Sequence, residues 1–241
     1  VVFINIAGFS LVLPLLPFYG QAFGAGPTGV ACLFAAYSLG NLFGEAYWGR
    51  LSDRLGRRRV MVVSTACAAA GYVAFAFAPD LATALVLRVV SGFFGGTLSV
   101  VLGNIADITP PEQRARNMGY FGAAFNLGLV LGPAIGGLLA MPALGAVGYR
   151  LPLFTAAGLA ATASLWAAFC LREPERQRAA ATAPQQSRMD TLRFAVGHGL
   201  IGRLLVIGFV AVVTFASMEA VDRKSTRLNS SHVALSRMPS S

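Results

Sequence analysis

Long apolar runs, separated by short polar or glycine-rich stretches, divide most of the sequence. A run of about 20 apolar residues is long enough to cross a lipid bilayer as a helix. The pattern therefore predicts an all-α membrane protein with seven spanning helices. We expect them at residues 1–19, 30–48, 60–77, 82–105, 118–139, 152–171 and 200–220.

The composition supports a membrane protein and excludes a soluble enzyme. Hydrophobic residues make up 56% of the 241 residues and charged residues only 12%, whereas soluble domains carry about 25% charged residues. Nothing in the sequence provides a nucleophile with its base, a metal-ligand cluster or a phosphate-binding loop. We therefore expect no enzyme, no metal and no cofactor.

The positive charges gather in alternate connections. Arginines crowd residues 50–59, 114–116 and 172–193, whereas the connections at 20–29, 78–81 and 140–151 carry at most one charge each. Basic loops face the cytoplasm in multi-pass proteins, so the net charge of +9 indicates membrane topology, not nucleic-acid binding. We expect the cell (inner) membrane, with the N-terminus and the central loop in the cytoplasm.

The spacing of these features divides the chain. Residues 1–171 form a six-helix transmembrane bundle, and the polar stretch 172–199 is a cytoplasmic linker. Residues 200–221 are the seventh helix. Residues 222–241 are rich in serine and differ in composition from the rest, so we expect them to be translated adapter sequence from sequencing, unrelated to the fold.

Polar residues within membrane helices are costly and usually face a cavity. They occur in the first, second, fourth and fifth helices, so these helices should line a polar path while the third and sixth pack outside. Alternatives remain: interfacial placement for the arginine, pairing with loop arginines for the glutamate, and interhelix hydrogen bonds for the first and last asparagines. The candidates are Asn5, Asn41, Glu45, Arg88 and Asn126.

Small residues recur every four positions on three helices, which allows close backbone packing. The second helix has Ala36, Gly40 and Gly44, the fourth has the set from Ser91 to Gly103, and the fifth has the set from Ala124 to Ala140. Prolines at positions 14, 17 and 133 should bend or loosen their helices.

Four motifs resemble those of the major facilitator superfamily, in family order. GRLSDRLGRRR at 49–59 resembles the signature between its second and third helices. LPLLPFY at 13–19, LRVVSGFFGG at 87–96 and GLVLGPAIGG at 128–137 resemble motifs of the first, fourth and fifth helices of its drug:proton antiporters. A further stretch, ADITPPEQRARNMG at 106–119, resembles the connection between the fourth and fifth helices of the tetracycline-efflux-like group.

The resemblance implies twelve helices in two bundles, so this chain would be truncated, with the seventh helix starting a C-terminal bundle that is missing here. It implies Arg88 in proton coupling and a hinge in the fifth helix. It also implies a conformational latch between the second and third helices. The latch residues are Gly49, Asp53, Arg54, Gly56, Arg57 and Arg58, and the hinge residues are Gly128, Gly132, Pro133, Gly136 and Gly137.

One position departs from this group. Tetracycline exporters carry an aspartate nine residues before the proline that matches Pro14, and here that residue is Asn5, which cannot carry a proton. Glu45 is a possible substitute. We expect proton-coupled efflux of small, drug-like or hydrophobic molecules, with the substrate, protons and the lipid bilayer as partners. The alternatives are a sugar or metabolite facilitator and a non-transporting membrane protein.

Overall fold

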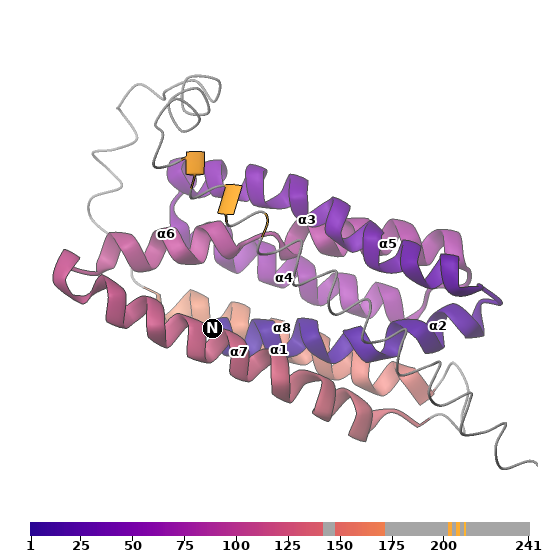
Figure 1. Ribbon diagram of the computed structural model, residues 1–241. Coiled ribbons are helices and arrows are strands. Elements are labelled where there is room, and N and C mark those ends of the chain that lie inside the picture. The colour runs from indigo at the N-terminus through magenta and orange to yellow at the C-terminus, as the bar shows by residue number, and fades with distance from the viewer. Residues whose placement is uncertain (142–147, 172–201, 204–205, 208–209, 211–241) are drawn as a thin grey trace, which may run out of the picture. The chain divides into compact units, whose positions relative to one another are not determined.

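The computed structural model describes residues 1–141, 148–171, 202–203, 206–207 and 210 (Figure 1). The chain divides into two units, Val1–Ala183 and Pro184–Ser241. Every regular element in the described residues is a helix, which confirms the all-α prediction. The predicted linker, the tail and most of the seventh helix lie outside these residues.

The first unit contains the six predicted helices, two of them interrupted. The connection of residues 142–147 is not described. The elements are α1 (Val2–Val12), η1 (Leu13–Leu15), α2 (Leu16–Ala22), α3 (Pro27–Leu55), α4 (Arg57–Ala76), α5 (Leu81–Gly95), α6 (Leu98–Ile108), η2 (Pro111–Gln113), α7 (Arg114–Leu139) and α8 (Arg150–Cys170).

Five segments of the described chain are long and apolar enough to cross a membrane: Val2–Ala22, Arg57–Ala76, Leu81–Ile108, Pro111–Leu139 and Arg150–Cys170. The 29-residue helix α3 is long enough to cross, but it carries Asn41, Glu45 and a charged end, which lower its apolar character. It packs against α5 within the bundle.

The prolines interrupt the first span as expected. Pro14 lies in the 3-10 turn η1, and Pro17 lies in the first turn of α2. Proline lacks the N–H that a continuing helix needs, but it fits the first turn of a new one. The α7 helix, in contrast, runs through Pro133 without a break from Arg114 to Leu139.

The fourth span, predicted at 82–105, runs over Leu81–Ile108, but it is not one continuous helix. The chain leaves the helical conformation at Gly96 and Thr97, so the fourth span consists of α5 and α6. At Gly96 the backbone lies directly against α3, where a Cβ would meet the backbone of Gly44 and Glu45. The close approach of two backbones therefore coincides with the break.

The prediction of a loop at 49–59 was also wrong. Helix α3 continues to Leu55 and α4 begins at Arg57, with only Gly56 between them. Gly56 has a φ of 100°, a conformation that residues with a Cβ rarely adopt. Gly49, Asp53 and Arg54 thus lie on the last turns of α3, and the arginines that follow Gly56 start α4.

Close packing joins α3 to α5 and α1 to both α7 and α8, while α4 packs against α8 (Figure 1). The predicted glycine faces of the second and fifth helices are buried at these contacts. On the fourth span, however, Gly92 approaches the α3 backbone, whereas Gly95 approaches only the Tyr37 side chain. The residues that carry this contact are therefore one position away from the predicted stripe.

Candidate functional site

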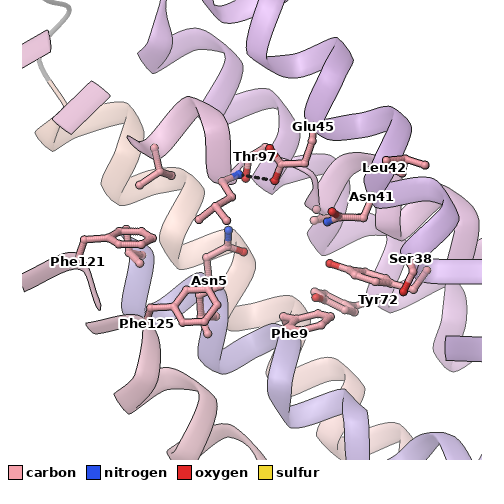
Figure 2. A pocket seen from close by; sticks show the side chains of 17 residues that line it. Asn5, Phe9, Ser38, Asn41, Leu42, Glu45, Tyr72, Thr97, Phe121 and Phe125 are labelled. Atoms are coloured by element: carbon pink, nitrogen blue, oxygen red, sulfur yellow. Dashed lines mark hydrogen bonds between the residues drawn. The ribbon is translucent and has the colours of Figure 1, made fainter. Parts of the chain in front are cut away.

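A cavity of about 510 Å³ opens between the helices of the first unit. Figure 2 shows Asn5 and Phe125 on one side and Asn41 and Tyr72 on the other, with Glu45 beside Thr97. Apolar and aromatic side chains form most of its wall. The lining residues are Val2, Asn5, Ile6, Phe9, Tyr37, Ser38, Asn41, Leu42, Glu45, Ala68, Tyr72, Gly95, Thr97, Leu98, Val101, Phe121 and Phe125.

Three lining residues form a polar row along α3. Tyr37, Asn41 and Glu45 are four residues apart, a spacing that places side chains on one face of a helix. Asn5 reaches the cavity from α1. Of the five polar candidates in the sequence, Asn5, Asn41 and Glu45 are thus brought together around one space.

The Glu45 carboxylate is bonded to the start of α6. Its Oε1 accepts the backbone N–H of Leu98 and its Oε2 accepts that of Ser99, each at 2.9 Å. In the described part of the chain the carboxylate is thus bonded to backbone amides, which differs from the alternative of a glutamate paired with loop arginines. The Glu45 carboxylate, which lines the cavity, is therefore hydrogen-bonded to the first turn of α6.

Arg88 lies behind the cavity wall, with only 2% of its surface exposed. Its guanidinium carbon is 5.1 Å from the centre of the Tyr37 ring and 5.5 Å from that of Phe75. Both distances are in the range of cation–π attraction. The arginine is therefore neither at an interface nor in the cavity, and Tyr37 separates it from the cavity.

Two residues are placed differently from the sequence expectation. Asn126 is exposed, donates to the carbonyl of Gly122 at 2.8 Å and does not line the cavity, which α7 instead reaches through Phe121 and Phe125. Tyr72 of α4 does line it, although the third helix was expected to pack outside. The sequence criterion considered only charged and amide side chains in the spans, so it did not include this tyrosine.

The predicted latch residues gather at one end of the bundle. Arg57 pairs with Asp53 at 3.0 Å and with Asp107 of α6 at 2.9 Å, and it also donates to the Ser52 hydroxyl. Arg58 donates to the carbonyl of Ala168 in α8. The ends of α3, α4, α6 and α8 are therefore tied together here, and Asp107 is a partner that the motif alone did not identify.

The predicted hinge glycines of α7 face α1. Gly128, Gly132 and Gly136 are buried where a Cβ would meet the α1 backbone, whereas at Gly137 a Cβ would meet nothing within 4 Å. The Ser10 hydroxyl donates to the Gly128 carbonyl at 2.8 Å. Close contact therefore explains three of the four glycines.

Comparison with known proteins identifies the family. Residues 1–236 match the sequence model of the Major Facilitator Superfamily. The quinolone resistance protein NorA of Staphylococcus aureus (strain MSSA476) is 27% identical over 92% of this chain and 57% of its own length. The class C tetracycline resistance protein of Escherichia coli is 32% identical over 86% of this chain and 52% of its own length.

The chain belongs to the major facilitator superfamily. It spans about half the length of these curated relatives. Membership in this family, together with the apolar spans, makes it a multi-pass membrane protein. Its relatives include a quinolone resistance protein and a tetracycline resistance protein. The cavity described above is lined by residues of α1, α3, α4, α5, α6 and α7.

Proposed function

We propose that the chain is part of a proton-coupled exporter that moves small, drug-like or hydrophobic molecules by alternating access. The observation that carries the proposal is the cavity, whose apolar and aromatic wall is interrupted by a few polar groups. Such a lining favours amphipathic organic molecules over sugars, which need a dense set of hydrogen-bonding side chains. In the complete transporter, a second bundle would provide the opposite wall.

In this proposal, Glu45 carries the proton. Among the described lining residues it is the carboxylic acid, and Asn5 cannot take that role. Asn41 and Tyr37 continue the polar row along α3, and Arg88 lies behind the Tyr37 ring. Asn5 lies on the proposed substrate path because it lines the cavity. Asn126 donates to the Gly122 carbonyl and does not line the cavity, so it is not part of this path.

We propose that the arginine-rich end of the bundle lies on the cytoplasmic side of the inner membrane. Arginines at the end of α3 and at the starts of α4 and α7 lie there, and the opposite ends of the helices carry Asp80 and Arg150. The positive-inside rule supports this orientation. The Arg57 contacts would then form the cytoplasmic latch, and the α7 glycines the hinge against α1.

Everted membrane vesicles with the full-length transporter test the proposal. A pH gradient is imposed, and a quinolone or a tetracycline, the compounds in the relatives' names, is added. We expect the substrate to discharge the gradient, and Glu45→Gln to abolish the discharge while substrate still binds. The matched control is Glu112→Gln, which removes an exposed carboxylate in η2.

The alternatives give different results in this assay. A facilitator for sugars or metabolites would equilibrate its substrate without moving protons, so the gradient would persist. A non-transporting protein would show no substrate-dependent signal in any variant. Discharge that is unchanged in Glu45→Gln would contradict the assignment of the proton to this residue.

A further inference from the structure

The second half of the fourth span begins beside the cavity without a cap of its own. Thr97 occupies the position before α6, but its side chain makes no capping hydrogen bond. The first N–H groups of any helix lack partners within that helix. Such groups need an acceptor from a side chain, from another element or from water.

Glu45 supplies that acceptor from the neighbouring helix. Each of its two carboxylate oxygens accepts one of the successive N–H groups of Leu98 and Ser99. The Ser99 hydroxyl in turn donates to the backbone carbonyl of Glu45 at 3.3 Å. A negative charge at a helix N-terminus is also favoured by the helix dipole, so the cap is strongest while Glu45 is ionised.

The packing around the α5–α6 junction is tight, so the contact between Glu45 and the first turn of α6 is the interaction that can change. Gly44 and Gly96 bring the backbones of α3 and the α5–α6 junction so close that neither position has room for a Cβ. The Trp48 indole also donates to the Phe93 carbonyl at 2.7 Å. The junction is thus fixed to α3, and the first turn of α6 depends on one carboxylate that lines the cavity.

We propose that Glu45 is a removable cap. While ionised it holds the first turn of α6, and when it is neutralised that turn loosens, which changes the cavity wall at Thr97, Leu98 and Val101. A protonated carboxyl keeps one good acceptor oxygen and loses its charge, so it cannot hold both amides equally well. The inference deepens the proposed function, on which its link to proton transport rests.

The groups that face Glu45 leave its charge uncompensated by any cation in the cavity. Within the described lining, α1 and α7 contribute neutral side chains, and the junction contributes backbone amides. The titratable neighbours are Tyr37 on α3 and Tyr72 on α4, and the nearest buried cation is Arg88, behind the Tyr37 ring. The backbone amides of α6 are therefore the direct stabilising partners of the carboxylate.

Amide hydrogen exchange of the 241-residue chain in lipid nanodiscs tests the cap directly. For Glu45→Ala at neutral pH, we expect peptides covering the start of α6 to exchange about tenfold faster, the effect of losing a helix cap. Glu45→Gln, which keeps one acceptor, should show a smaller increase. Peptides from α8 in both variants, and all peptides in Glu112→Gln, should match the wild type. Equal exchange at the start of α6 in Glu45→Ala and the wild type would overturn the cap.

A second readout follows the ionisation. The chain has two tryptophans, so Trp166→Phe leaves Trp48, which packs in one apolar cluster with Val100 of α6, as the fluorescent reporter. We expect its emission to change in one step as the pH is lowered, and this step to be absent when Glu45→Gln is added. A step that persists in Glu45→Gln would overturn the dependence on Glu45.

Neither readout requires transport, so the two proposals can fail separately. Unchanged exchange with intact proton-coupled export rejects the cap alone. Faster exchange, with export still coupled to protons in Glu45→Gln, supports the cap and rejects Glu45 as the proton carrier.

Discussion

At the scale of single residues, Arg88 has the least ordinary environment. It is a buried cation, and its Nε–H finds no hydrogen-bond partner in the described part of the chain. Two aromatic rings contribute about 0.5–2 kcal/mol each by cation–π attraction, less than the several kcal/mol that burying a charge costs. A residue that lowers stability at such a site is more easily explained by function than by folding.

Replacing Arg88 with methionine separates these roles. The side chain keeps a similar volume and loses its charge, so we expect Arg88→Met to be neutral or stabilising by about 1–2 kcal/mol. Export should be lost. Thermal unfolding in detergent and vesicle transport measure the two effects. Arg150→Met, at a half-buried arginine that starts α8 and lies over the Phe77 ring, should leave export intact. A destabilised Arg88→Met with normal export would show that the arginine is structural.

The sequence predicts the chemistry of the cavity better than its geometry. Asn5, Asn41 and Glu45 were identified because polar side chains in apolar spans are costly, and all three line the cavity. Asn126 does not line the cavity, because its amide finds a hydrogen-bond acceptor in the Gly122 carbonyl of its own helix. Tyr72 was missed because its ring is compatible with an apolar span, and only the packing reveals which way it faces.

At the scale of helices, small-residue patterns predict which faces are close but not which residue makes the contact. On α3 and α7 the predicted glycines meet a neighbouring backbone, whereas on the fourth span the contact shifts to Gly92 and Gly96. Hydropathy did not reveal the break at Gly96 because the apolar run continues across it. The start of α5, in contrast to the break at Gly96, can be recognised in the sequence, because Asp80 caps the helix by accepting the Thr83 N–H. This hydrogen bond lowers the pKa of the Asp80 carboxyl.

Two adjacent glycines of α7 provide a matched test of close packing. At Gly136 an added Cβ would run into the carbonyl of Leu11, whereas at Gly137 it would meet nothing. We expect Gly136→Ala to destabilise the bundle by about 1–3 kcal/mol through overpacking. Gly137→Ala should stabilise it by about 0.5–1 kcal/mol, because alanine favours helices. Thermal unfolding of the two variants side by side measures the difference, and equal midpoints would contradict the α1–α7 contact.

At the scale of the whole bundle, α6 is held by charged contacts at both of its ends. Glu45 of α3 binds its first turn, and Arg57 of α4 binds Asp107 near its last turn. The remainder of the fourth span, α5, is held by apolar and glycine packing against α3. Charged contacts can be exchanged, so we expect α6 to shift at its two ends while Val100 stays in the apolar core.

Removing the contact at the far end of α6 tests this reasoning. Asp107 is partly exposed, with 33% of its side chain accessible, so its ion pair should contribute less than about 1 kcal/mol to stability. If the pair holds one arrangement of the transporter, Asp107→Asn should nevertheless slow export severalfold, and more strongly at low salt, where the wild-type pair is least screened.

Asp53→Asn should have a smaller effect, because Asp53 is 53% exposed and joins Arg57 across only four residues, without tying α6 to α4. Vesicle transport at two ionic strengths, with unfolding midpoints measured in parallel, distinguishes these cases. Export that is equally slow in both variants would place the latch at the α3–α4 turn and not on α6.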